Sequence, residues 1–246
     1  MEIELAENER LDDLGIKNLK IIQNKDFFCF GIDSVILANY AKNLKQKSYV
    51  LDLGTGTGII PTILCGKTNL NKIIGVEIQE EVCKMANKSI QYNNLQERFE
   101  IISDSILNLN NYFEKNTFDV VITNPPYKKK DTGIINITES KTLARHEITA
   151  TLEDFIKIAK DMLKDKGEFY MVQRAERLVD ICFYMRKYKI EPKEIRFVCS
   201  KPGQSPKLVL IKGKKNENAF LKIMPNLYIY DENGEYSQEI KEMYNN

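Results

Sequence analysis

The sequence predicts an α/β protein whose core is one mixed sheet of seven strands, with helices on both faces and an antiparallel C-terminal hairpin. In the middle of the chain, short β-rich runs alternate with amphipathic helical segments, which is the pattern of βαβ units in a largely parallel sheet. The first of these runs breaks into closely spaced glycines. The last two runs are joined by a short connection, which indicates that they pair antiparallel.

Seven runs have the apolar and β-branched composition of strands. They span residues 48–53, 72–78, 99–103, 118–123, 167–172, 195–199 and 207–211. Pro202, Gly203 and Pro206 lie between the last two runs. A parallel crossover needs roughly a dozen residues or more, so this pair is expected to form the hairpin that closes the sheet.

Two apolar stripes at helical spacing predict crossover helices. One stripe lies between the second and third strands and the other between the fourth and fifth: Val82, Met85, Ala86 and Ile90, then Leu152, Phe155, Ile156, Ala159, Met162 and Leu163. Thr151, with Asp154 three residues on, predicts a capped start for the later helix, and Gly167 is expected to end it. Asp33 is expected to cap a further helix over residues 34–40 that covers the cofactor site.

Length and composition favour one domain. The chain has 246 residues, of which 43% are apolar, enough to bury one sizeable core. We expect a single domain over 1–246, with an N-terminal helical cover (1–47), a core (48–212) and a C-terminal extension (213–246). The 36 basic and 35 acidic side chains leave a net charge of +1, so a nucleic-acid surface must come from local clustering.

Neither a metal site nor a membrane span is expected. The 5 cysteines are widely spaced and only 1 histidine is present, which excludes the usual zinc patterns and a disulfide framework. The N-terminus is acidic, and there is no apolar run of about 18 residues. The protein is therefore expected to be soluble and cytoplasmic.

A glycine-rich turn follows the first predicted strand. Gly54, Gly56 and Gly58 allow positive φ and a close approach of the backbone, so a ligand can lie where the next helix starts. A plain tight turn is the alternative, because glycine is a general turn former. The dinucleotide fingerprint needs a third glycine where Ile59 stands, which weighs against NAD.

Two acidic residues follow the next strands in order. Glu77 closes the second strand, where a carboxylate can accept hydrogen bonds from both hydroxyls of a ribose. Asp104 follows the third, where it can accept from an adenine amino group. Each acid alone could simply be solvated. Together with the glycine turn, they predict an adenosine cofactor at the carboxyl edge of the sheet, where ligands of open α/β sheets collect.

The fourth predicted strand leads into Asn124, Pro125, Pro126 and Tyr127, which we expect to be the catalytic residues. A simple turn is the alternative, since Asn-Pro and Pro-Pro mark loops. However, the Asn124 side-chain oxygen and the Pro125 carbonyl could accept the two N–H groups of an amide or exocyclic amine, so its lone pair points at a methyl donor. The two prolines restrict the backbone, and Tyr127 offers a ring face for stacking on the target.

Residues 52–58, Glu77, Asp104 and residues 124–127, in this order, resemble the class I amino-methyltransferases that use S-adenosylmethionine. The segments at 19–24, 28–38 and 144–147 further resemble the bacterial enzymes that methylate N6 of adenine 37 in a valine tRNA. The likeness covers about residues 12–212.

The resemblance implies a Rossmann-like fold and a role for each motif. Asp52 and the glycine turn would hold the methionine part of S-adenosylmethionine, Glu77 and the adjoining Ile78 the ribose side, and Asp104 the adenine. Residues 124–127 would hold the target, and tRNA would be the partner.

Lysines follow the catalytic loop directly. Lys128, Lys129 and Lys130 could neutralise phosphates beside a flipped nucleotide, although a solvated charge run is the alternative. Five later lysines could extend this basic rim: Lys201, Lys207, Lys212, Lys214 and Lys215. His146 is interpreted as a hydrogen-bonding residue at a helix start rather than a catalyst.

Three alternatives remain open on sequence alone. A protein methyltransferase acting on a glutamine amide would use the same two acceptors, but such enzymes usually carry a long helical domain before the glycine turn. Here about 50 residues precede Asp52. A DNA or ribosomal-RNA methyltransferase shares the loop. A degenerate fold that only binds RNA is the non-enzymatic alternative, and the intact Asn124 and Tyr127 speak against it.

Overall fold

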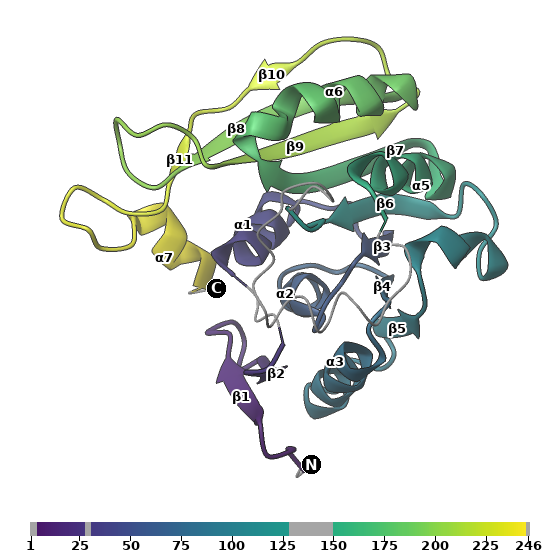
Figure 1. The fold of residues 1–246 in the computed structure, drawn as a ribbon, viewed down its shortest axis with the longest axis vertical. Coiled ribbons are helices and arrows are strands. Elements are labelled where there is room, and N and C mark those ends of the chain that lie inside the picture. The colour runs from purple at the N-terminus through teal and green to yellow at the C-terminus, as the bar shows by residue number, and fades with distance from the viewer. Residues whose placement is uncertain (1–3, 28–30, 128–149, 245–246) are drawn as a thin grey trace.

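The computed structural model describes residues 4–27, 31–127 and 150–244, and Figure 1 shows its sheet with helices on both faces. The strands are β1 (Glu9–Asp13), β2 (Lys20–Asn24), β3 (Tyr49–Leu53), β4 (Lys72–Glu77), β5 (Phe99–Ser103), β6 (Phe118–Thr123), β7 (Leu163–Arg174), β8 (Ile190–Cys199), β9 (Leu208–Lys215), β10 (Lys222–Ile223) and β11 (Leu227–Tyr228). The helices are α1 (Ile32–Tyr40), α2 (Ile59–Lys67), α3 (Glu80–Tyr92), α5 (Leu152–Met162), α6 (Leu178–Lys187) and α7 (Gln238–Tyr244), with the short 3-10 helices η1 (Ile106–Asn111) and η2 (Ala175–Arg177).

The seven expected strands form the body of the sheet in the order β5-β4-β3-β6-β7-β9-β8. Neighbours from β5 to β7 pair in parallel, whereas β9 pairs antiparallel with both β7 and β8. The predicted fold class and its closing hairpin are therefore confirmed. Two strands of two residues each, β10 and β11, pair with β8 and bring the sheet to nine strands.

The strand order reverses between β3 and β6. β3 pairs with β4 on one side and with β6 on the other. The chain thus runs outward in one direction up to β5 and returns to the opposite side of β3 for β6. Such a switch point leaves space at the carboxyl ends of the strands, where ligands of open α/β sheets bind.

The central strands are buried on both faces, which explains why their sequences are mainly apolar and do not alternate. Val50 belongs to the core beneath α1 and α2, whereas Leu51 and Leu53 belong to the core beneath α5 and α6. Each of these residues is 0% exposed. This two-sided packing anchors β3, so the turn that follows it starts from a rigid base.

The expected helical cover over residues 1–47 is wrong in part. α1 is present, but β1 and β2 form an antiparallel hairpin that packs against α3. The Ile22 amide donates to Ser89 Oγ at 2.9 Å, and Asn93 exchanges hydrogen bonds with the backbone of Lys20. Ser89 of α3 and Asn93, the residue that follows the helix, thus bind backbone groups along one edge of β2. The charged composition of β1 gave no alternating pattern from which the hairpin could be predicted.

The two ends of α5 can be compared with the start and end predicted from the sequence. Thr151 and Asp154 form a complete capping box at the start of α5, as predicted. The helix does not continue to Gly167, because α5 ends at Met162 and Gly167 lies inside β7. A side chain at Gly167 would come within 2.9 Å of the Lys164 carbonyl oxygen, so this glycine permits a tight bend in the strand.

The C-terminal extension completes the molecule on the side of α1. β9 continues to Lys215, past the expected core boundary, and the residues beyond it add β10, β11 and α7. α7 packs against α1, and the Arg196 guanidinium binds both carboxylate oxygens of Glu239 at 2.6 and 2.7 Å.

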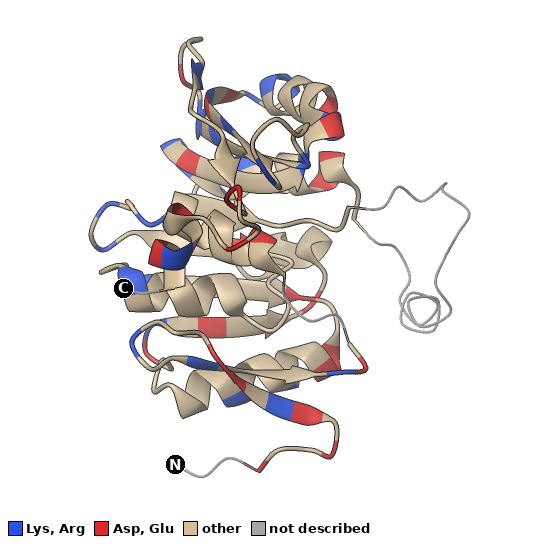
Figure 2. Ribbon diagram, turned by 90° about the vertical axis from the view of Figure 1, so that its left-hand side faces the viewer, with Lys and Arg blue, Asp and Glu red and all other residues tan. Residues whose placement is uncertain are grey.

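Charge is distributed without a dominant sign. In Figure 2, basic and acidic segments are interspersed over the visible side of the ribbon. No helix among the described residues is long and apolar enough to cross a membrane.

Candidate functional site

Four adjacent strands end at one edge of the sheet. Leu53 of β3 pairs with Thr123 of β6 and with Val76 of β4, and Glu77 pairs with Ser103 of β5. The hydroxyl of Thr123 donates to the Leu53 carbonyl at 2.8 Å, which ties the end of β6 to the end of β3. The glycine turn, the two acidic residues and the loop at 124–127 therefore leave the sheet side by side.

Two positions of the glycine turn, Gly58 and Gly56, have a positive φ and lack a side chain for different reasons. Gly58 begins α2 with φ of 84°, and a Cβ there would lie 2.8 Å from the Phe99 ring. Only glycine fits this position without displacing a core side chain. Gly56 has φ of 57°, and the place of its missing Cβ is open, so a ligand can lie against the backbone there.

Asp52 is a buried carboxylate with one unsatisfied oxygen. It is 0% exposed, and its Oδ2 accepts from the Thr55 hydroxyl at 2.7 Å. None of the residues that the structure describes donates a hydrogen bond to its Oδ1. Burial raises the Asp52 pKa to about 7, against the lowering effect of the Thr55 hydrogen bond, and Glu77 adds to the rise. A cationic donor at Oδ1 would satisfy this atom and stabilise the ionised form.

Glu77 links the glycine turn to the end of β4. Oε2 accepts from the Gly56 amide and Oε1 from the Gln79 amide, both at 3.0 Å. The residue is only 7% exposed. Oε1 also accepts from Gln79 Nε2 at 3.4 Å, whereas Oε2 keeps a second lone pair, so Glu77 can still accept from a ribose hydroxyl while it holds the turn in place.

Asp104 lies one strand further along the edge. Its Oδ1 accepts from the Ser105 amide and Asn108 Nδ2, and its Oδ2 accepts from the Tyr112 hydroxyl at 2.8 Å. The hydrogen bonds from Asn108 and Tyr112 hold its pKa below the usual value. Asp104 is thus an ionised acceptor, oriented by its neighbours.

The loop at 124–127 contacts the first turn of α1. Asn124 Nδ2 donates to Ser34 Oγ at 3.1 Å, and the Tyr127 hydroxyl donates to Asp33 Oδ2. Burial, with Asp33 beside it, raises the Tyr127 pKa well above its ordinary value, so the hydroxyl remains a donor. The Arg174 guanidinium lies 5.2 Å from the centre of the Tyr127 ring.

Sequence reasoning missed the partners of this loop. Asp33 was expected to cap α1, but Gly31 is at the cap position and makes no side-chain cap bond, while Asp33 lies inside the helix and accepts from Tyr127. Ser34 and Arg174 were not expected at the site. Each is distant in sequence from the loop, and no local pattern signals contacts of this range.

The prediction that five later lysines extend the basic rim of the site is wrong for three of them. β9 runs antiparallel to its neighbours and carries its later lysines away from the edge with the glycine turn. Lys212 and Lys214 lie 3.0 and 3.6 Å from Glu168 Oε1. Lys215 is 5% exposed and donates to Asn116 and to two backbone carbonyls. Lys201 and Lys207 remain in the connection before β9. Residues 128–130 and His146 lie outside the described residues.

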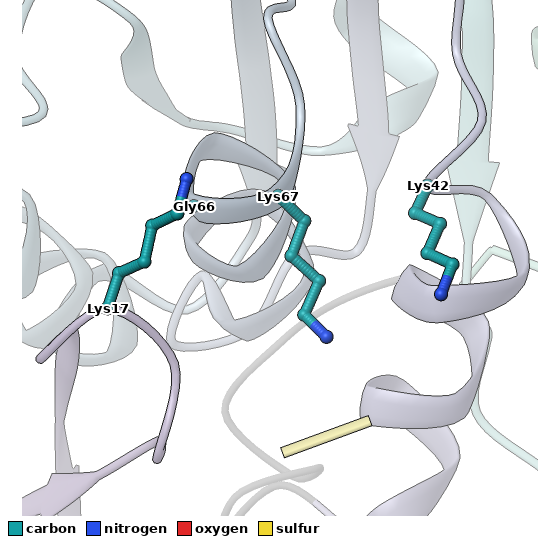
Figure 3. A pocket seen from close by; sticks show the side chains of 4 residues that line it. All are labelled: Lys17, Lys42, Gly66 and Lys67. Carbon is teal, nitrogen blue, oxygen red and sulfur yellow. The ribbon is translucent and has the colours of Figure 1, made fainter. Parts of the chain in front are cut away.

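Two cavities lie away from this edge. One, of about 220 Å³, lies at the far end of α2 and is lined by Lys17, Lys42, Gly66 and Lys67 (Figure 3). The ammonium of Lys67 donates to Asn39 Oδ1 and the Met243 carbonyl, so it joins α2 to α1 and α7. The other, of about 410 Å³, includes the buried Lys215. In the described part of the chain, no group of three or more potential ligand side chains could hold a metal ion.

The fold is that of the class I methyltransferases, as two solved structures show. A predicted O-methyltransferase from Agrobacterium tumefaciens superposes with a TM-score of 0.70 at 17% identity, covering 87% of this chain and 95% of that one. TYW2 from M. jannaschii, solved in complex with AdoMet, gives 0.56 at 16% identity, covering 86% and 88%.

The chain belongs to the methyltransferase small domain family, whose model matches residues 19–181. Two relatives are named tRNA1(Val) (adenine(37)-N6)-methyltransferase. That of Histophilus somni is 29% identical, covering 93% of this chain and 94% of the relative. That of Porphyromonas gingivalis is 27% identical, covering 93% and 91%. Family membership confirms the expected methyltransferase activity with S-adenosylmethionine as methyl donor.

Proposed function

We propose that this protein methylates N6 of an adenine in tRNA, at anticodon-loop position 37, with S-adenosylmethionine as donor. The observation that carries the proposal is the position of Asn124 and its loop at the end of β6, directly beside the glycine turn that ends β3. The names of the relatives support tRNA as the substrate. A tRNA substrate implies that the protein acts in the cytoplasm.

The chain offers a fitting cradle for the cofactor. We assign the methionine part to Asp52 and the glycine turn, the ribose to Glu77 with Ile78 beside it, and the adenine to Asp104. The unsatisfied Oδ1 of Asp52 suits the cationic amino group, and the open space at Gly56 suits close contact with the backbone. S-adenosylmethionine, when bound there, supplies an electrophilic methyl group.

Asn124 and Pro125 activate the target nitrogen in this proposal. The lone pair of an exocyclic amine is delocalised into the ring, which makes the nitrogen a weak nucleophile. Acceptance of its two N–H groups by Asn124 Oδ1 and the Pro125 carbonyl favours a tetrahedral nitrogen, with the lone pair directed at the methyl carbon. The target nitrogen, held by these two acceptors, would release its surplus proton to water after it has received the methyl group. No strong base is required.

Substrate contacts are proposed on the same side. Arg174 is exposed and lies over the Tyr127 ring, and within the described parts of the chain it forms no salt bridge with an acidic side chain. We assign a phosphate-neutralising role to Lys128, Lys129 and Lys130 because they follow Tyr127 in the sequence, and to Arg174 because it lies over the Tyr127 ring. Tyr127 is assigned to the target base.

The substrate class is tested by offering labelled S-adenosylmethionine with total tRNA, total protein and genomic DNA in parallel. We expect label in tRNA, recovered as N6-methyladenosine on nucleoside analysis. A transcript whose anticodon-loop adenine is changed to guanine should take up none. Label on protein glutamine would overturn the tRNA assignment but would still agree with methylation of a nitrogen atom. If no substrate takes up label, a degenerate fold that only binds RNA would be favoured.

Cofactor affinity should depend on pH through Asp52. Its pKa of about 7 means that the carboxyl is increasingly protonated as pH falls below 7, whereas the cationic amino group of the cofactor favours the carboxylate. Binding must then remove the proton, so Kd should rise by about tenfold per pH unit below about pH 7 and level off above it. Titration calorimetry across this range measures the profile. Asp52→Asn keeps the size of the side chain and should bind weakly at every pH. A flat profile in the unchanged protein contradicts the assignment.

A further inference from the structure

The first turn of α1 touches both ends of the catalytic loop. Ser34 accepts a hydrogen bond from Asn124, and the next residue toward the N-terminus, Asp33, accepts one from Tyr127. The partners are 90 and 94 positions apart in the sequence. Two consecutive residues of one helix therefore hold the first and last residues of a four-residue loop.

The Ser34 contact orients the Asn124 amide. A side-chain amide has an acceptor oxygen on one side and a donor nitrogen on the other. In the structure Nδ2 donates to Ser34 Oγ, so Oδ1 lies on the other side of the amide group. A rotated amide would present its N–H groups to the N–H groups of the target and lose the acceptor. Ser34 is 6% exposed, so water competes little for this hydrogen bond.

The Asp33 contact holds the other end of the loop. The Tyr127 ring packs against the core beneath α1, its hydroxyl is bound to Asp33, and Arg174 lies over the ring. These three contacts leave Tyr127 little freedom to rotate. α1 itself is anchored by a row of fully buried side chains, among them Ile36, Leu37 and Ala38, so its first turn is a rigid support.

We propose that Ser34 and Asp33 are positioning residues for methyl transfer: Ser34 directs the Asn124 oxygen at the target nitrogen, and Asp33 fixes Tyr127 against the target base. This inference rests on the proposed function, since it takes the amino group of the target as the ligand of Asn124. Neither residue touches the reacting atoms.

Steady-state kinetics test the role of Ser34. Ser34→Ala should lower kcat by about tenfold, the scale of one oriented hydrogen bond, with KM for the RNA and Kd for the cofactor within about twofold of the original values. Ser34→Thr, which keeps the hydroxyl, should restore most of kcat. Asn39→Ala is the matched control, because it removes buried hydrogen bonds from the other end of α1 without touching the loop. An equal fall in kcat in the control would mean that Ser34 only stabilises the helix.

A double-mutant cycle separates positioning from general damage. In an Asn124→Ala background, Ser34→Ala should have no further effect on kcat, because the amide that Ser34 is proposed to position is gone. Asp33→Ala and Tyr127→Phe should each lower kcat by a similar factor. The double variant should lower kcat no further than either single variant. Independent, additive effects in either cycle would overturn the proposal for that pair.

A spectroscopic measurement makes the test independent of substrate identity. In 15N NMR spectra of the full chain, the Asn124 side-chain amide signals should shift in Ser34→Ala and remain in place in Asn39→Ala. Unmoved signals in Ser34→Ala would refute the contact itself. If these signals shift but tRNA is not methylated, the proposed function fails while the contact stands, and the cycle is then measured on whichever substrate the unchanged protein labels.

Discussion

Asn124→Ala is expected to reduce turnover by more than about 100-fold while leaving cofactor affinity unchanged. The variant keeps the Pro125 carbonyl but loses the side-chain acceptor, which acts chiefly when the target nitrogen becomes tetrahedral in the transition state. The cofactor residues leave other strand ends, β3, β4 and β5, so they should not sense the change. Single-turnover rates and titration calorimetry measure the two quantities separately.

Asn124→Asp provides the companion measurement. A carboxylate still accepts from the target amine, and the Ser34 hydroxyl can donate to it in place of accepting from the amide. Activity should therefore lie between that of the unchanged protein and that of the alanine variant. Near-normal turnover in Asn124→Ala would contradict the mechanism, because the loop would then act without its main acceptor.

Glu77→Ala is expected to weaken S-adenosylmethionine binding by about 10- to 100-fold, which is the scale for losing hydrogen bonds to a charged acceptor. The loss has two sources. The ribose loses its acceptor, and the Gly56 and Gln79 amides lose the carboxylate that holds the turn in shape. Calorimetry on the isolated protein gives the change in Kd.

Glu77→Gln separates these two sources. The amide oxygen of glutamine can serve one of the two backbone donors, so the turn should be partly preserved and binding should fall less than in the alanine variant. Thermal unfolding of all three proteins shows whether the variants remain folded. Undiminished affinity in Glu77→Ala would remove Glu77 from the cofactor site.

Much of the fold could be predicted because its signals are local. The two-sided burial of β3 appears in the sequence as a mainly apolar run in which Asp52 is the one charged residue, and the capping box at Thr151 depends on residues three positions apart. The antiparallel pairing of β8 with β9 follows from the short connection between them, which a parallel pair could not use. The hairpin of β1 and β2 was missed because its edge is satisfied by side chains of α3, far along the chain.

The lysines of β9 are a second case in which the sequence could not predict the contacts of a side chain. Composition marks Lys212, Lys214 and Lys215 only as basic residues near the end of the chain. The direction of β9 decides that Lys212 and Lys214 lie beside Glu168, and that Lys215 is buried among carbonyl acceptors. The sequence shows that these residues are positively charged, but their interaction partners depend on the direction and register of β9.

The sequence by itself determined which groups could carry the chemistry: a glycine turn after a buried strand, acids at the ends of the next two strands, and the Asn-Pro-Pro-Tyr loop. These patterns are short-range: a few neighbouring residues, through the backbone conformations that they allow, determine the local structure. Only the tertiary structure decided that Ser34 and Asp33 hold the two ends of that loop, and that Asp52 keeps one oxygen unsatisfied. Such contacts join residues brought together by packing of the whole sheet, so no local pattern encodes them.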